Sequence, residues 1–269
     1  MIKSVVSNEY QELQKEIIIL QEQWKLQIAS KSFKINFDQA EIEAGAPIVE
    51  LAELELDMPR YKRWISELID LMISFKPEIE SELLKIPSLL TEETLIDWFG
   101  EAFFVNYTYF KRFAEEHEIL ESIPQFLAEV ALRPFLQVIS EKAQPEVEQM
   151  NLSEYCPVCF EPVRLATLDE EGKKVIQCPR CHAHWHAKSL ECSHCGNEDH
   201  TTIHFLSIEG ESAMQIQVCE QCKCYIKIID TKQFITKPSV ALLDLLSIHL
   251  DFVAQDNGYS PVREKKVIH

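Results

Sequence analysis

The stretch of sequence between residues 156 and 222 contains four cysteine pairs: CPVC (156–159), CPRC (178–181), CSHC (192–195) and CEQC (219–222). Two residues between the cysteines of a pair let both sulfurs point at one cation from a tight turn. Two such turns brought together form a tetrahedral site of four sulfurs that is closed to substrate. One CxxC pair alone is a weak signal, but four in so short a stretch predict two metal sites.

The spacing of the pairs indicates which turns combine. Eighteen residues separate the first pair from the second and 23 separate the third from the fourth, whereas only 10 lie between the second and third. The two longer intervals fit a β-hairpin that returns one turn to the other, and the short interval fits a connector. We therefore expect one site from pairs one and two and another from pairs three and four; spacing leaves crosswise pairing open.

The sequence alone does not identify the metal or its role. Two zinc ribbons would stabilise modules too small for a core of their own, since a structural zinc site contributes roughly 10 kcal/mol or more. Two rubredoxin-like iron sites would use the same tetrahedral four-sulfur geometry. Thioredoxin-like redox chemistry lacks the βαβ context that it needs. A closed site of four cysteines leaves no coordination position for a substrate, so no catalytic residue is predicted.

Other residues that could bind metal lie beside these pairs. Cys224 is the ninth cysteine and is predicted to be a spare thiol rather than a fifth ligand. Histidines beside a turn with four cysteines available are more often packing residues or partners of the ligands than ligands themselves. They are His182, His184, His186 and His194. Trp185 is expected to pack over its module.

Composition bounds the class of protein. The chain has 269 residues, a net charge of −18 and no cysteine before Cys156. Its charge disfavours nucleic-acid binding, because phosphate backbones repel acidic surfaces. We expect no membrane span, because no run of 18 apolar residues occurs. Without a secretory signal at the N-terminus, a cytoplasmic protein with reduced thiols is expected. Only six glycines occur, and neither a P-loop nor a dinucleotide fingerprint is present.

The charge divides the chain near residues 145–153. Residues 1–150 carry 14 basic and 28 acidic side chains, and residues 151–269 carry 12 and 16. The first part has apolar residues at helical spacing, with predicted caps at Asp57 and Thr91 and a helix that opens at Ser122. It is interrupted by a turn at 45–47. We interpret it as an all-helical domain whose acidic face is solvated.

The second part changes to short alternating segments that predict strands. They are Val175–Gln177, Thr202–Ile208, Met214–Val218 and Tyr225–Ile229. A closing helix is predicted from Pro238 to near Asn257-Gly258, and its wide apolar surface is expected to pack most simply against the helical part. The fold class is therefore α+β.

These residues resemble the formate dehydrogenase accessory protein FdhE family. The resemblance rests on Tyr155-Cys156-Pro157-Val158-Cys159, on Cys178-x-x-Cys181 followed by Trp185-His186, and on Cys192-Ser193-x-Cys195. It continues through Cys219-x-x-Cys222, Tyr225-x-Lys227 and Asp256-x-Gly258-Tyr259. Residues that match the family pattern are frequent from residue 155 to about 260 and few before 150.

The resemblance implies four domains: an acidic helical domain (1–150), two tandem rubredoxin-like metal modules (151–188 and 189–235), and a C-terminal helix with its tail (236–269). It implies two metal ions, iron by resemblance or zinc, with Trp185 and His186 as candidate neighbours of the ligands. The ligands would be Cys156, Cys159, Cys178 and Cys181 in one site and Cys192, Cys195, Cys219 and Cys222 in the other.

The resemblance also implies a cytoplasmic, non-enzymatic assembly chaperone. Its partner would be the formate dehydrogenase catalytic subunit, with the twin-arginine signal region of that subunit and self-association as further candidate interactions. The alternatives are a rubredoxin-like electron carrier and, ranked last, a zinc-ribbon module that binds nucleic acid.

One feature departs from the family pattern. A glycine is expected after several CxxC pairs because the turn favours a positive φ there. Only Cys195 is followed by glycine, Gly196, whereas Phe160, His182 and Lys223 follow the other pairs. Turns that are either strained or differently closed are expected at these three residues.

Overall fold

The computed structural model of the protein describes residues 5–28, 33–150 and 154–263. The chain divides into two compact units. The helical unit comprises Asn8–Lys34 and Glu53–Val138, and the cysteine unit comprises Met1–Ser7, Ile35–Ala52 and Ile139–His269. The segment 35–52, which precedes most of the helices in sequence, therefore belongs to the unit that carries the cysteines.

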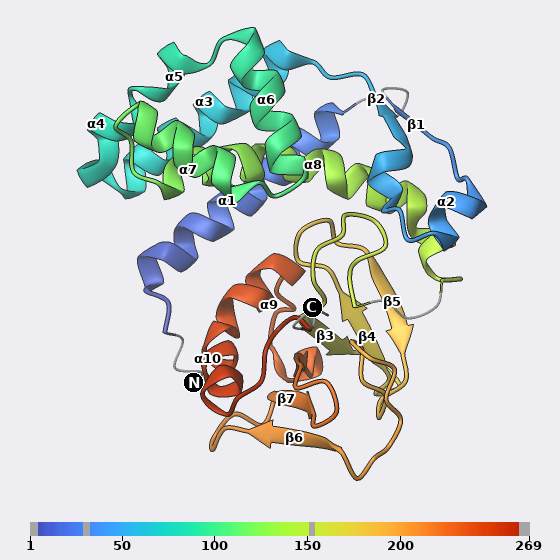
Figure 1. The fold of residues 1–269 in the computed structure, drawn as a ribbon. Helices are drawn as coiled ribbons and strands as arrows, with labels where there is room; N and C mark the ends of the chain where they lie inside the picture. The colour runs from blue at the N-terminus through green and yellow to red at the C-terminus, as the bar shows by residue number, and fades with distance from the viewer. Residues whose placement is uncertain (1–4, 29–32, 151–153, 264–269) are drawn as a thin grey trace, which may run out of the picture. The chain divides into compact units, whose positions relative to one another are not determined.

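The helical unit is built from helices (Figure 1) that enclose an aromatic core. Its elements are α1 (Asn8–Gln27), α3 (Met58–Phe75), η2 (Pro77–Ile79), α4 (Glu80–Leu83), α5 (Ile86–Leu89), α6 (Glu92–Phe103), α7 (Tyr107–Glu116) and the first part of α8 (Ser122–Val147). Both predicted caps are confirmed: Asp57 accepts from the Arg60 N–H at 2.9 Å and Thr91 from the Thr94 N–H at 3.1 Å. The rings of Trp24 and Trp64 stack at 5.3 Å in the core.

The cysteine unit contains a six-stranded sheet in the order β5-β4-β3-β8-β7-β6. The strands are β3 (Leu165–Leu168), β4 (Lys174–Gln177), β5 (His184–Ala187), β6 (Ile203–Ser207), β7 (Met214–Cys219) and β8 (Tyr225–Ile229). Neighbouring strands are antiparallel except β3 and β8, which pair in parallel with Leu165 opposite Lys227. The two cysteine modules predicted from the spacing thus share one continuous sheet.

The sheet repeats one local plan twice. In each half a CxxC turn leads into a strand, a hairpin returns the chain in a second strand to another CxxC turn, and a third strand follows. The hairpins are those that the longer cysteine intervals predicted. The division into separate domains at 150, 188 and 235 stays a prediction.

The closing helical segment differs from the expectation in two respects. It forms two helices, α9 (Val240–Leu246) and α10 (Ile248–Asp256), which meet at Ser247. The hydroxyl of Ser247 donates to the Leu243 carbonyl at 2.8 Å, so the side chain competes for the backbone where the first helix ends.

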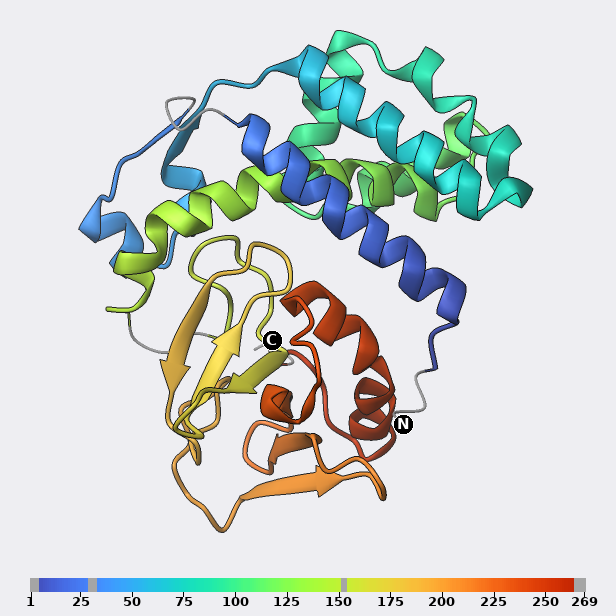
Figure 2. The same cartoon turned by 180° about the vertical axis from the view of Figure 1, so that it is seen from behind.

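The apolar surface of α9 and α10 was expected against the helical part, but its buried residues join the core of the sheet. Figure 2 shows the two helices in red beside the strands. This core includes Leu165, Ile216, Tyr225, Ile229, Leu243, Leu250 and Ala254. The sheet has an apolar face of its own, and covering that face buries both surfaces at once.

The segment before α3 is more ordered than its sequence indicated. It forms β1 (Phe33–Ile35), α2 (Gln39–Glu43), η1 (Ile48–Leu51) and β2 (Ala52–Leu54), and the predicted turn at 45–47 contains Gly45 with φ 94°. Within the described residues, no helix has the length and apolar character that crossing a membrane requires.

Candidate metal centres

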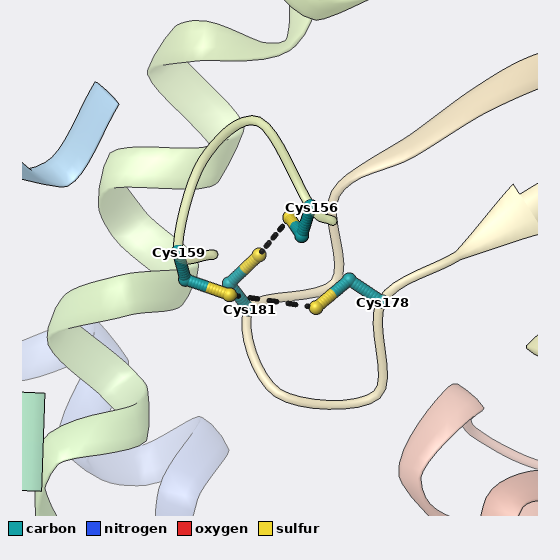
Figure 3. Close-up of side chains that lie close together, drawn as sticks. All are labelled: Cys156, Cys159, Cys178 and Cys181. Atoms are coloured by element: carbon teal, nitrogen blue, oxygen red, sulfur yellow. Dashed lines mark hydrogen bonds between the residues drawn. The ribbon is translucent and has the colours of Figure 1, made fainter. Parts of the chain in front are cut away.

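The first candidate centre brings together Cys156 and Cys159 from one turn with Cys178 and Cys181 from another. The four side chains point toward one another (Figure 3). The Sγ atoms of Cys156 and Cys181 are 3.5 Å apart, as are those of Cys159 and Cys178. All four residues are buried. The first and second pairs therefore combine in the order expected from their spacing.

The second candidate centre joins Cys192 and Cys195 with Cys219 and Cys222. Its sulfurs are 3.6 Å apart between Cys192 and Cys222 and 3.8 Å apart between Cys195 and Cys219. Cys192 and Cys219 are buried, whereas Cys195 and Cys222 are only partly buried. The two centres thus share a geometry and differ in their exposure.

These distances fit a tetrahedral metal ion. Metal–sulfur bonds of about 2.3 Å at tetrahedral angles place the sulfurs about 3.8 Å apart, whereas a disulfide needs about 2.05 Å. Burial raises the pKa of the Cys159 and Cys181 thiols, so the ionised sulfurs need a cation beside them. Both groups of four cysteines could therefore hold a metal ion.

All four turns have the same backbone hydrogen bonds. In each turn the N–H of the first cysteine donates to the carbonyl five residues later, and the N–H four residues later donates back to the carbonyl of that cysteine. The first bonds run to Glu161, Ala183, Asn197 and Cys224, and their lengths lie between 2.7 and 3.0 Å. This pattern holds the backbone of both cysteines of each pair in one tight turn.

The residue after each pair adopts the left-handed conformation, as predicted from the turn. The φ angles are 59° at Phe160, 65° at His182, 70° at Gly196 and 58° at Lys223. A side chain in this region costs roughly 1–2 kcal/mol per residue, so three of the four turns carry strain. The exposed ring of Phe160 stacks on Tyr155 with centroids 4.4 Å apart.

Three hydrogen bonds hold the first centre. The backbone N–H groups of Ile48 and Val49 in η1 donate to the carbonyls of Pro157 and Val158, at 2.9 and 3.0 Å. The guanidinium of buried Arg180 donates to the Cys159 carbonyl at 3.3 Å. A buried cation beside a site of four thiolates offsets part of their charge. Ile48, Val49 and Arg180 were not predicted from the sequence; the position of Arg180 inside a CxxC pair was the available signal.

Different contacts hold the second centre. The Nε2 atom of His194 donates a hydrogen bond of 2.9 Å to the Tyr225 carbonyl. The side-chain amide of Asn197 donates to the Cys219 sulfur at 3.5 Å. The tail after α10 also contributes, because the Ser260 N–H donates to the Lys223 carbonyl at 2.8 Å. Tyr259 bonds to Glu220 through its hydroxyl. The Gly258-Tyr259 motif thus anchors the fourth turn.

The remaining residues beside the pairs have other partners. Cys224 is buried in the strand that leaves the fourth turn, with its sulfur 3.6 Å from the Cys222 carbonyl. His186 is exposed and bonds to Asp169 at 3.3 Å, and His184 is also exposed. Trp185 is buried in β5 opposite Ile176. The role of Trp185 and His186 beside the ligands stays a prediction.

A network of charges around buried Lys227 ties the sheet to the closing helices. Lys227 in β8 lies 2.9 Å from Asp244 in α9 and 2.8 Å from Asp251 in α10. Arg164 lies 2.9 Å from Asp244 and also bonds to Glu161 of the first turn, and the Tyr225 hydroxyl donates to Asp251. The buried charge of Lys227 therefore has two opposite charges beside it, which its burial requires.

The fold and the two centres define a protein with a helical unit and a two-site tetracysteine unit. Residues 190–266 match the model of the family described as FdhE, C-terminal domain. An FdhE homologue from Aquifex aeolicus is 28% identical over 239 residues, which cover 85% of this chain and 78% of the homologue. One from Enterobacter sp. is 25% identical over 76% of this chain and 64% of its own length.

A solved structure has the same fold. The crystal structure of the FdhE protein from Pseudomonas aeruginosa matches 91% of this chain and 84% of its own with a TM-score of 0.60, at 17% sequence identity. The chain is therefore similar to FdhE proteins over most of its length and has the fold of one of them.

Proposed function

We propose that this protein is an accessory protein of formate dehydrogenase, which binds the catalytic subunit in the cytoplasm while that subunit matures. The similarity to FdhE proteins supports formate dehydrogenase as the client. The observation that carries the proposal is the pair of four-cysteine groups. In each group the four sulfurs would occupy all four coordination positions of a tetrahedral metal ion. A site of this kind organises a protein or transfers electrons rather than activating a substrate, so the protein acts by binding and not as an enzyme.

Each group of cysteines holds one metal ion in this proposal. The ligands are Cys156, Cys159, Cys178 and Cys181 in the first centre and Cys192, Cys195, Cys219 and Cys222 in the second. Iron and zinc both suit tetrahedral thiolates. The ion supplies a cross-link between two turns, and iron would add one-electron chemistry. The chain positions the sulfurs through the repeated backbone bonds and neutralises part of their charge through Arg180.

The acidic first part of the chain attracts the client. Residues 1–150 contain twice as many acidic as basic side chains, so a basic segment such as a twin-arginine signal region would meet a favourable field. Glu50, Glu53 and Glu55 are exposed together in one short segment. Reversing these three charges should slow association and flatten its salt dependence, as measured by surface plasmon resonance. An unchanged salt dependence would contradict electrostatic attraction.

A rubredoxin-like electron carrier is the second candidate. It is favoured by the partial exposure of Cys195 and Cys222, which would bring a bound iron within reach of a redox partner. A reversible change in visible absorbance on reduction of the iron-loaded protein would support it. Nucleic-acid binding remains the weakest candidate, given the charge of −18.

Co-purification tests the main proposal. Tagged protein from anaerobically grown cells should recover the formate dehydrogenase catalytic subunit, and the double variant Cys156→Ser with Cys159→Ser should lose it. Cys224→Ser is the matched control, because Cys224 belongs to neither group of four. If the unaltered protein recovers no catalytic subunit although both metals are bound, the assembly function is wrong and the electron carrier becomes the better account.

A further inference from the structure

The two centres differ in how their sulfurs are covered. The four cysteines of the first centre are at most 4% exposed. In the second centre Cys192 and Cys219 are similarly hidden, but Cys195 and Cys222, one from each turn, are partly exposed. One edge of the second centre therefore faces outward.

That edge lies on a cleft. Cys195 and Cys222 line a hollow of about 950 Å³, together with Lys223, Tyr259 and Arg263. Its charged side chains are already paired, since Lys223 bonds to Glu220 and Arg263 lies 3.8 Å from Glu154. The cleft is thus a path for small molecules to the sulfurs rather than a site of fixed charge for one ligand.

The first centre has additional backbone constraints. Its first turn accepts hydrogen bonds from Ile48 and Val49, both buried, and its second turn carries buried Arg180 against the Cys159 carbonyl. A competing ligand would have to displace these contacts before it reached a sulfur. Opening of this kind has a free-energy cost that a solvent-facing edge avoids.

We propose that the second centre is the exchangeable metal site, which gains and loses its ion through the edge formed by Cys195 and Cys222, whereas the first centre retains its ion. In each exchange step a donor atom of the incoming ligand forms a bond to the metal as one metal–sulfur bond breaks. The released thiolate takes a proton from water. No oxidation occurs, and the step repeats until the ion has left.

This inference rests on the proposal that both groups of cysteines bind metal. The test uses full-length protein loaded with two equivalents of zinc and challenged with excess EDTA and N-ethylmaleimide at neutral pH. Metal release is followed by atomic absorption, and the alkylated cysteines are identified by peptide mass mapping. One zinc should leave at least tenfold faster than the other, with labels first on the four cysteines of the second centre.

A pair of variants tests the role of the cleft. Tyr259→Ala removes the side chain that bonds to Glu220 and lies under Lys223, whose Nζ is 5.5 Å from the ring centroid. It should accelerate the fast release severalfold and leave the slow release unchanged. Phe252→Ala is the matched control, because Phe252 is an exposed aromatic residue of α10 outside the cleft lining, and it should change neither rate.

Three outcomes would overturn the inference. Release of both ions at one rate, or earlier labelling of the first centre, would contradict it while leaving metal binding intact. Fewer than two zinc ions in the loaded protein would contradict the metal-binding proposal and this inference with it.

Discussion

The backbone N–H of Ile48 donates a hydrogen bond of 2.9 Å to the carbonyl oxygen of Pro157, inside the first CxxC turn. Residues 53–138 of the helical unit separate Ile48 from Pro157 in sequence. The contact makes η1 part of the first candidate centre, which would otherwise consist only of residues after 150. The cysteine unit therefore cannot be defined by its cysteine-containing stretch alone.

Truncation of Ile48 should destabilise the cysteine unit. Ile48 is fully buried, and Ile48→Ala should lower the free energy of unfolding by about 2–4 kcal/mol through lost burial and a residual cavity. Urea unfolding followed by circular dichroism measures this change. Ile235→Ala, at a fully exposed residue of the same unit, should change stability by less than about 0.5 kcal/mol. Equal effects of the two variants would show that η1 contributes nothing to the unit.

Two glycines should respond to alanine with opposite signs. Gly196 has φ 70°, and a Cβ there would meet only the Glu191 carboxylate, at 3.9 Å, so Gly196→Ala should lower stability by about 1 kcal/mol through backbone strain alone. Gly100 lies inside α6 with open space around it, and Gly100→Ala should raise stability by about 0.5–1 kcal/mol. Thermal unfolding of both variants checks this. A stabilising Gly196→Ala would contradict the left-handed turn.

The charge network should produce a stability change in acid. Burial by itself raises the pKa of Asp244, but Arg164 and Lys227 outweigh it and hold that pKa below its ordinary value. The native state therefore binds fewer protons than the unfolded state near the ordinary carboxyl pKa of about 3.9. The contribution of Asp244 to the free energy of unfolding is therefore fully present above the ordinary carboxyl pKa. It is lost as the pH falls from that value toward the lowered pKa of the native state.

Asp244→Asn isolates this effect. At pH 7 it should cost about 2 kcal/mol, because Arg164 and Lys227 each lose one of their charged hydrogen-bond partners. Urea unfolding of both proteins at matched metal loading, from pH 7 to pH 4, should show the difference narrowing below about pH 5. A constant difference across this range would contradict a lowered pKa in the native protein.

Local chemistry explains which features were predictable. Asp57 and Thr91 were identifiable as caps because a side-chain oxygen satisfies a nearby N–H, and the CxxC turns repeat one hydrogen-bond pattern whatever follows them. The positive φ at Phe160, His182 and Lys223 followed from that same pattern. These features depend on residues within a few positions of one another.

Long-range backbone contacts explain what the sequence did not reveal. The parallel pairing of Leu165 with Lys227 merges two modules into one sheet, and the bond from Ile48 to Pro157 brings η1 to the first centre. Backbone groups make both contacts, and every residue carries the same backbone groups, so neither leaves a side-chain pattern. The ion pairs of Lys227 also leave no local pattern, because its two acidic partners lie on helices that follow it in the chain.

Metal analysis combined with X-ray absorption spectroscopy tests the central claim most directly, namely that the eight paired cysteines form two four-sulfur metal sites. The purified protein should contain two metal ions per chain, each surrounded by four sulfurs at about 2.3 Å. Cys156→Ser should lower the metal content, and Cys224→Ser should leave it at two. Fewer than two ions in the unaltered protein, or nitrogen ligands from the neighbouring histidines, would contradict the account.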